Sequence, residues 1–357
     1  MKSESRHLPF SASQITLTPN PQNLTQDRKA MATKYRFIVV TSLVVLLNFP
    51  GRTQPMFIHD PVMIKQDGTY YLFCTGNGIS FFSSKDMKDW KQEKPVFSSG
   101  PQWAMDEIAG FKGHIWAPDI SFYKGKYRLF YSVSAFGKNT SCIGLAENAT
   151  LNPSDPNYKW EDKGKIIQSV PGRDDWNAID PNFILDDEGK PWLSFGSFWS
   201  GIKLVKLNDN LTGLALPETW YPLASRPRDS FTAYDKAGEG SIEAPFIVKH
   251  NNFYYLFVSF DFCCRGIESN YKVMVGRSTE LTGPYLDKNG FPMLMGSGSL
   301  VIAGNHDYPG VGHNAVCTFE GQDYLVFHAY KAAENGRPEL LVRELKWDTD
   351  GWPVVNL

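Results

Sequence analysis

The stretch His59-Asp60-Pro61-Val62-Met63-Ile64-Lys65 decides the fold, because variants of it return four more times along the chain. Each variant begins near an acidic or imidazole side chain and runs on into a short apolar strand. A turn rich in Gly or Asn follows, and after it comes an aromatic strand such as residues 70–73. The other variants start near residues 117, 179, 242 and 312. The chain is therefore built from five copies of one strand–turn–strand unit.

The spacing of these units predicts the architecture. The polar anchors at positions 60, 119, 180, 243 and 313 are separated by 59, 61, 63 and 70 residues. Each unit also offers a third strand, for example residues 142–146 or 202–207, and no long helical period lies between the strands. Antiparallel sheets repeated around an axis make a propeller. We predict an all-β fold, a five-bladed β-propeller with four-stranded antiparallel blades around a central channel, closed by residues 352–355 pairing with the first strands.

The polar anchors of the five units are expected to converge. The innermost strand of each blade lines the channel, so equivalent residues on five inner strands lie on one ring. Five side chains are predicted at this place: Asp60, Asp119, Asp180, Glu243 and His313. Crowded carboxylates repel one another, which destabilises a fold unless a proton, a metal or a function accommodates them. One Asp-Pro pair is common at turns, but five anchors in register indicate a functional site at one mouth of the channel.

The amino-acid composition limits the classes of molecule that the protein is expected to bind. With 42% hydrophobic residues, the 357-residue chain can bury a large core. Lys and Arg number 36 against 38 Asp and Glu, and no basic run offers itself to successive phosphates, which argues against nucleic acid. Aromatic residues are 14% of the chain, and their flat rings suit the apolar faces of sugars, although most are expected in the core.

The N-terminal segment is typical of a targeting sequence. Lys34 and Arg36 precede an apolar run over residues 37–49, which is the pattern of a secretory signal, with Met31 as a second candidate start. The run is short for a transmembrane span, but an uncleaved anchor stays open because no A-x-A-like cleavage site follows. We expect a leader over residues 1–52, a propeller domain over 53–357, and a secreted protein, extracellular or periplasmic, without a stable membrane partner unless the leader remains as an anchor.

Five cysteines form an odd set without a C-x-x-C pair, which argues against a structural zinc site and a dense disulfide framework. Most are expected to be buried free thiols. The adjacent Cys263 and Cys264 are left open as to their redox state.

Three short strings resemble glycoside hydrolase family 43. They are H-D-P at 59–61, D-P-N at 180–182 and E-A-P at 243–245, in this order and at blade spacing. Residues 176–182, 196–201, 260–266 and 312–316 resemble, more narrowly, its endo-1,5-α-L-arabinanases. The resemblance runs from about Ile58 to the C-terminus. It implies endo-hydrolysis of the 1,5-α-L-arabinofuranosidic bonds of arabinan, with inversion of configuration and with arabinan or arabino-oligosaccharides as the substrate.

An inverting glycosidase needs an ionised carboxylate as base and a protonated one as acid, about 6.5–9.5 Å apart to admit a water. The resemblance implies that Asp60 is the general base and Glu243 the general acid. It makes Asp180 the third carboxylate, whose negative charge would raise the pKa of Glu243 and hold its orientation.

The resemblance also implies a substrate-binding set and a metal. The residues expected to contact the substrate are Asp60, Trp116, Phe136, Gly137, Asn177, Ala178, Ile179, Asp180, Ser197, Phe198 and Trp199. Among them, Trp116 and Phe136 are candidates for stacking on a sugar ring, although both could instead be core residues. His313 matches a histidine that faces a calcium ion in the channel largely through waters. Calcium prefers oxygen ligands, so another cation, or none, stays open. No organic cofactor is expected, and Asp119 is expected to orient its neighbours or water.

Three alternatives remain. An exo-acting α-L-arabinofuranosidase or β-xylosidase would share the carboxylates and block one end of the cleft. The fructan-cleaving propellers usually carry N-D-P, whereas His59 precedes Asp60 here. A non-catalytic carbohydrate-binding propeller is disfavoured by intact carboxylates at all three places.

Overall fold

A computed structural model describes residues 56–233 and 235–357. The expected leader, with its apolar run over 37–49, lies outside these residues. Within the described part, no helix has the length and apolar character needed to cross a membrane.

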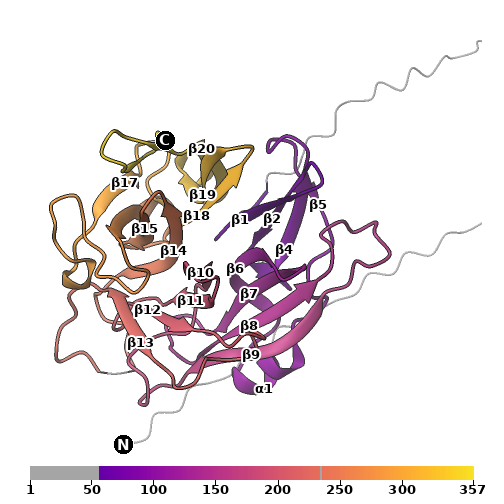
Figure 1. Cartoon of the computed structure of the whole chain (residues 1–357), viewed down its shortest axis with the longest axis horizontal. Coiled ribbons are helices and arrows are strands. Elements are labelled where there is room, and N and C mark those ends of the chain that lie inside the picture. The colour runs from indigo at the N-terminus through magenta and orange to yellow at the C-terminus, as the bar shows by residue number, and fades with distance from the viewer. Residues whose placement is uncertain (1–55, 234) are drawn as a thin grey trace, which may run out of the picture. The chain divides into compact units, whose positions relative to one another are not determined.

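Five antiparallel sheets surround a central axis and confirm the predicted propeller (Figure 1). Blade 1 contains β1 (Val62–Gln66), β2 (Thr69–Cys74), β4 (Ser80–Ser84) and β5 (Lys91–Gln92). Blade 2 contains β6 (His114–Tyr123), β7 (Lys126–Ser134), β8 (Ser141–Asn148) and β9 (Glu161–Ser169), with the two-residue β3 (Gly76–Asn77) on its inner edge. Blade 3 contains β10 (Asn182–Leu185), β11 (Pro191–Phe195), β12 (Ile202–Lys206) and β13 (Trp220–Ala224). Blade 4 contains β14 (Ile242–His250), β15 (Phe253–Phe260), β16 (Lys272–Ser278) and β17 (Ser299–Ala303). Blade 5 contains β18 (Val311–Phe319), β19 (Gln322–Lys331) and β20 (Arg337–Glu344).

The prediction of four strands per blade is wrong for two blades. Blade 5 has three strands, and blade 2 has five because β3 crosses over from blade 1. The only helices in the described part are short, namely α1 (Gln102–Glu107) and three 3₁₀ turns at Gly266–Glu268, Met293–Met295 and Ala332–Glu334.

The predicted closure by residues 352–355 is also wrong. The tail forms only a small hairpin of β21 (Lys346–Trp347) and β22 (Pro353–Val354). Contacts with blade 4 hold this hairpin, because the Tyr255 hydroxyl donates to the Gly351 carbonyl and the Arg277 guanidinium lies 4.4 Å from the Trp352 ring centre. Blades 5 and 1 instead meet directly, and the Asp60 amide donates to His328 Nδ1 at 3.2 Å.

The second strand of each blade is apolar and almost continuously buried, as in β2, β7, β11 and β15. Such runs fit strands that are covered on both faces, which is the position of a middle strand packed between two neighbouring blades. The core therefore lies between the blades.

Hydrogen bonds from the second strand of one blade to the inner strand of the next join the blades. We call these contacts the inter-blade bonds. The side-chain acceptors come at the ends of the second strands, and each accepts from the backbone amide of the next blade. The pairs are Thr75 with Ala117 (2.8 Å), Ser132 with Asp180 (2.9 Å), Ser259 with His313 (2.9 Å) and His328 with Asp60 (3.2 Å).

Removing one inter-blade bond is expected to destabilise the protein. In Ser132→Ala the buried amide of Asp180 loses its acceptor, which should lower the free energy of unfolding by about 1–3 kcal/mol. Urea unfolding measures this free energy. Ser297→Ala is the control, because the hydroxyl of Ser297 donates to the Phe291 carbonyl in a hydrogen bond that is exposed to solvent. A Ser132→Ala protein as stable as Ser297→Ala would contradict the assignment.

Candidate active site

One residue at the same point of each of the five inner strands has a left-handed backbone conformation. Positive φ angles occur at Asp60 (54°), Ala117 (43°), Asp180 (58°), Ala244 (56°) and His313 (50°). Side chains other than Gly rarely adopt this conformation, and it clusters at functional sites. The register of β6, β14 and β18 also shifts here, which is the behaviour of β-bulges near active sites. The kink re-aims the side chains at one mouth of the channel.

This register corrects the predicted ring. The equivalent residue of blade 2 is Ala117 rather than Asp119, and Glu243 comes one residue before the equivalent position in blade 4. Asp119 is buried in the channel, and its Oδ2 accepts from the Phe183 amide at 2.7 Å. Burial raises the pKa of Asp119 to about 7. Asp119 therefore orients the neighbouring inner strand, as expected, but does not lie at the mouth with Asp60.

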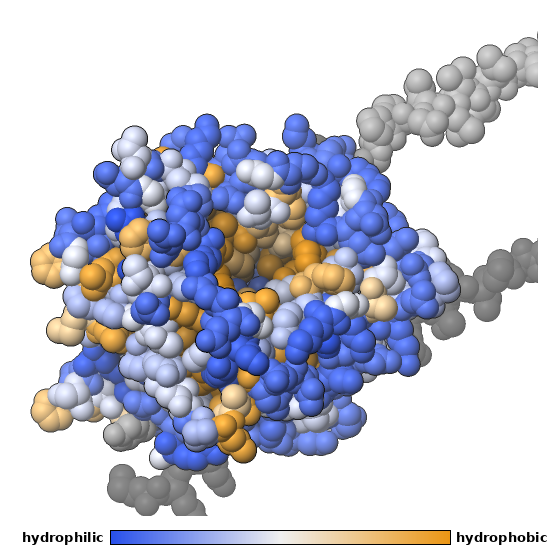
Figure 2. Space-filling view, viewed as in Figure 1, coloured by the Kyte–Doolittle hydropathy of each residue, from blue (hydrophilic) through white to orange (hydrophobic). Residues whose placement is uncertain are grey.

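A cavity of about 340 Å³ lies between the inner strands, lined by residues of β1, β6, β10, β14 and β18 that include Asp119. Figure 2 shows the face of the molecule that is hollowed at the centre of the ring. The three proposed catalytic carboxylates do not line this channel cavity.

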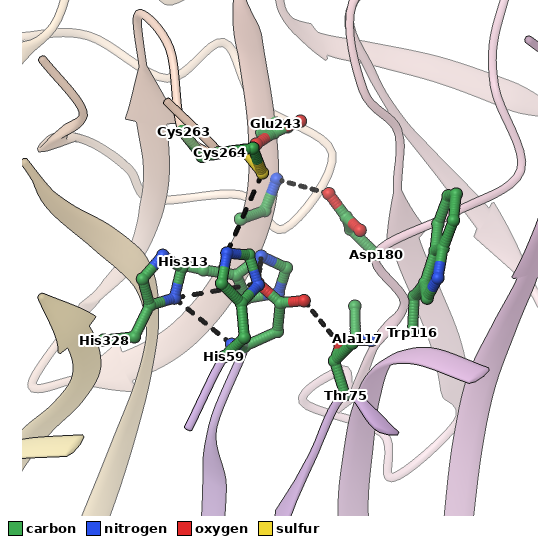
Figure 3. A network of polar contacts seen from close by, with 12 residues as sticks. His59, Thr75, Trp116, Ala117, Asp180, Glu243, Cys263, Cys264, His313 and His328 are labelled. Atoms are coloured by element: carbon green, nitrogen blue, oxygen red, sulfur yellow. Dashed lines mark hydrogen bonds and ion pairs between the residues drawn. A yellow bond between two sulfur atoms is a disulfide. The ribbon is translucent and has the colours of Figure 1, made fainter. Parts of the chain in front are cut away.

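Three side chains hold the carboxylate of Asp60, and Figure 3 shows these three, His59, Thr75 and His313, close together. Its Oδ1 lies 2.8 Å from His59 Nδ1 and 3.0 Å from His313 Nδ1, and its Oδ2 accepts from Thr75 Oγ1 at 2.5 Å. Burial by itself would raise the pKa of Asp60, but His313 and His59 outweigh it and hold the pKa well below its usual value. Asp60 is therefore ionised at neutral pH, as a general base must be.

His313 is the cationic partner of this carboxylate. Burial would lower the pKa of His313, but the negative charges of Asp60 and Asp180 outweigh it and raise the pKa to about 9. The imidazole is therefore positively charged at neutral pH and balances part of the negative charge at the mouth of the channel.

Glu243 lies at the start of β14, half-buried, with both oxygens hydrogen-bonded. Tyr271 Oη donates to Oε1 at 2.7 Å and Ser197 Oγ donates to Oε2 at 2.9 Å. Burial and then the charges of Glu243 and Asp180 raise the pKa of Tyr271 well above its usual value, so its hydroxyl stays a donor. Gly312 allows this approach, because a Cβ there would lie 2.2 Å from the Tyr271 ring.

The resemblance implies that Asp180 is a negatively charged neighbour of Glu243, but the pKa of Asp180 in the structure indicates a neutral side chain. It is buried, and its Oδ2 accepts from the Ala244 amide at 3.1 Å. Burial, together with the charges of Glu243 and Asp60, raises the pKa of Asp180 to about 8 against the opposing effect of His313. Asp180 therefore retains its proton at neutral pH.

The expected substrate-binding residues fall into two groups. Ser197, Asn177, Ala178, Ile179 and Trp199 are buried, so only their backbone or a small part of the side chain could face a ligand. Phe136 is 82% exposed, which removes a core role and suits stacking. Gly137 beside it has a φ of +71° and open space around its Cα. Trp116 and Phe198 are half-buried, with Trp116 Nε1 donating to His114 Nδ1 and the Phe198 ring 6.1 Å from Phe262.

Cys263 and Cys264 form a disulfide between neighbours, whereas Cys74, Cys142 and Cys317 are free and buried, as expected for most of the thiols. Cys264 Sγ lies 3.8 Å from His59 Nε2, so the disulfide borders the histidine that contacts Asp60.

The side chains near His313 do not fit a calcium site. Among the described residues, the groups of three candidate ligands are His59, Cys263 and Cys264, and His59, Asp60 and His328. Neither includes His313, and together they offer a single carboxylate, whereas calcium takes six to eight oxygens. Calcium stays a prediction from the resemblance.

The model of the glycosyl hydrolases family 43 matches residues 53–353. The chain belongs to this family. It is 52% identical to the extracellular exo-α-(1→5)-L-arabinofuranosidase of Cellvibrio japonicus, over 84% of this chain and 86% of the relative. It is 41% identical to the extracellular endo-α-(1→5)-L-arabinanase 1 of Bacillus subtilis, over 83% of this chain and 87% of that one. A Cellvibrio cellulosa α-L-arabinanase complexed with arabinohexaose superposes with a TM-score of 0.84 at 51% identity, covering 85% of this chain and 96% of the other. The family 43 propeller is thus confirmed as a glycoside hydrolase.

Sequence reasoning missed several residues of this family 43 site. Thr75, Tyr271, His328 and Tyr330 all contact the carboxylates or their histidines. They come from the second and third strands or the strand ends of the blades, where the repeat shows aromatic and polar residues without a distinguishing pattern.

Proposed function

We propose that this family 43 enzyme hydrolyses the 1,5-α-L-arabinofuranosidic bonds of arabinan with inversion of configuration. One observation carries the proposal: an ionised Asp60 lies in the same electrostatic environment as Glu243 and a protonated Asp180, so that a carboxylate base and a carboxylic acid are both available at this mouth of the channel. This is the combination of base and acid that an inverting glycosidase needs. The choice of arabinan as the substrate rests on the names of the relatives at 52% and 41% identity.

Asp60 is suited to activate the water. Each carboxylate oxygen can accept two hydrogen bonds, and Oδ2 accepts one, from Thr75. Thr75 Oγ1 itself accepts from the Ala117 amide, so its proton points at Asp60. One acceptor position on Oδ2 is left for a water, whose proton moves to Asp60 as the oxygen attacks the anomeric carbon.

Glu243 is suited to protonate the departing glycosidic oxygen. In the proposed step, Glu243 gives its carboxyl proton to the leaving oxygen. Ser197 and Tyr271 then stabilise the carboxylate that remains, because both can donate to an ionised Glu243. Asp180, which is protonated at neutral pH, adds no second negative charge beside this carboxylate.

The mode of attack has two candidates. The name of the relative at 52% identity favours exo action, which we place first. The resemblance of residues 176–182 and 260–266, and the name of the relative at 41% identity, favour endo action. The same two names include the word extracellular, from which we propose that the protein is secreted.

Digestion of debranched arabinan separates these candidates. We expect short products of narrow length range from the first minutes, with a slow fall in viscosity, because exo action shortens chains from their ends. An early ladder of oligosaccharides with a fast fall in viscosity would establish endo action instead. The anomeric configuration, followed by NMR, is expected to be inverted, and a retained configuration would overturn the mechanism.

A further inference from the structure

Three buried or half-buried side chains cluster beside Asp60, and the mechanism above gives no role to two of them, His328 and Tyr330. His59 and His328 stack with ring centres 3.9 Å apart, and Tyr330 meets both at their edges. His328 is fully buried and Tyr330 is 2% exposed. The hydroxyl of Tyr330 lies 2.8 Å from His59 Nε2 and 3.2 Å from His328 Nε2. The Tyr330 hydroxyl is therefore a junction between the two imidazoles.

A backbone amide sets the direction of the first hydrogen bond. The amide of Asp60 can only donate, and it points at His328 Nδ1 at 3.2 Å. Nδ1 is therefore the acceptor, and His328 carries its proton on Nε2. Burial lowers the pKa of His328 well below its usual value, in keeping with a neutral ring. The Nε2–H of His328 then donates to Tyr330.

A second amide sets the direction at Tyr330. The Cys264 amide donates to Tyr330 Oη at 2.8 Å. With His328 and Cys264 both donating, the two acceptor positions of the hydroxyl are filled, and its own proton is left for His59 Nε2. His59 must then carry its proton on Nδ1, which lies 2.8 Å from Asp60 Oδ1. The bonds start at the Asp60 amide and return to the Asp60 carboxylate.

We propose that Tyr330 is a positioning residue, which closes this ring of hydrogen bonds and thereby fixes His59 as an Nδ1–H donor to Asp60. The opposite tautomer of His59 would set a nitrogen lone pair against a carboxylate oxygen. The ring also ties the loop of the Cys263–Cys264 disulfide to the base through the Cys264 amide. The proposal rests on the proposed function in one respect, namely that Asp60 is the base.

The tautomers can be measured without an activity assay. The full chain contains seven His residues, so ¹⁵N-histidine labelling gives few signals in two-bond ¹H–¹⁵N spectra. At about pH 8, above the usual imidazole pKa of ~6.5, we expect His59 protonated on Nδ1 alone and His328 on Nε2 alone. His59→Gln and His328→Gln assign the two signals by their disappearance. A wild-type spectrum with His59 protonated on Nε2 would overturn the proposal.

Tyr330→Phe tests the role of the junction. Without the hydroxyl, His59 Nε2 has no donor and we expect mixed tautomers of His59, with kcat lower by about 10- to 100-fold and KM within about twofold, as for groups that orient a reacting residue. Tyr308→Phe is the matched control, because its hydroxyl also binds a partner in blade 5, the carboxylate of Glu339 at 2.6 Å. It should leave the tautomers and kcat unchanged.

The outcomes separate the two proposals. If Tyr330→Phe keeps the wild-type tautomers and kcat, the positioning role is wrong even where arabinan is cleaved as proposed. If arabinan is not a substrate, the wild-type spectrum still decides whether the ring exists. The wild-type spectrum also decides the ring if Tyr330→Phe fails to fold.

Discussion

Replacing Glu243 by Gln is expected to lower kcat on debranched arabinan by about 10²- to 10⁴-fold, the usual contribution of a general acid. The amide keeps the size of the side chain, and its oxygen can still accept from Tyr271 or Ser197, while its NH₂ group can donate to the other hydroxyl oxygen. It has no proton for the leaving oxygen. Reducing-sugar release under saturating substrate measures the loss.

The direction in which kcat/KM changes with pH follows from the pKa of Asp180. The pKa of Asp180 is raised to about 8, so Asp180 is neutral below this pH and ionises as the pH rises through about 8. Its negative charge then opposes the carboxylate that Glu243 becomes when it gives up a proton, so the kcat/KM of the wild type should fall on the alkaline side near pH 8. In Glu243→Gln this alkaline limb should disappear, because no carboxylate forms at position 243.

An aryl arabinofuranoside with a nitrophenolate leaving group supplies a further control, because such a leaving group needs little protonation. If the variant is tested on it, the loss should be smaller than on arabinan. Glu344→Gln, at an exposed position at the end of β20, should behave as the wild type. A Glu243→Gln enzyme with more than about a tenth of the wild-type kcat would remove Glu243 from the role of acid.

Asp60→Asn is expected to cause a loss of similar size, about 10²- to 10⁴-fold in kcat, because the amide cannot take the proton of the attacking water. The new NH₂ group would also face N–H and O–H donors, since His59, His313 and Thr75 all point at the carboxylate. Initial rates and circular dichroism, measured together, separate lost chemistry from lost folding.

Azide distinguishes a missing base from a damaged site. In Asp60→Ala, azide is a nucleophile that needs no deprotonation, and we expect it to restore part of the rate and to give a glycosyl azide of inverted configuration. Asp106→Asn, an exposed carboxylate in α1, is the matched control. Unimpaired hydrolysis by Asp60→Asn would show that another group activates the water.

The blade repeat was enough to predict the number of blades, because each unit repeats a pattern of apolar strands and turns. It was not enough to align the inner strands. The anchors were matched by their acidic or imidazole side chains, whereas the structure aligns them by left-handed backbone at Ala117 and Ala244 in blades 2 and 4. Alanine gives no sign of such a conformation, so Asp119 was placed on a ring to which it does not belong.

The three carboxylates of the proposed site could be picked out because they sit in short strings at or before the inner strands. Their partners could not. Tyr271 approaches Glu243 over Gly312, a contact between two blades that depends on how the sheets twist. The tail likewise contains alternating apolar residues that suit a strand, but the Tyr255 and Arg277 contacts with residues 351 and 352 keep it on blade 4.

The direct meeting of blades 5 and 1 has a consequence for how the enzyme is made. Asp60 belongs to the first blade to be synthesised, whereas His313, His328 and Tyr330 belong to the last. A nascent chain thus carries the proposed base through most of translation without the side chains that ionise and aim it. We expect hydrolytic competence only after the final blade docks against the first, because a chain stopped before residue 313 has the three carboxylates but lacks His313, His328 and Tyr330.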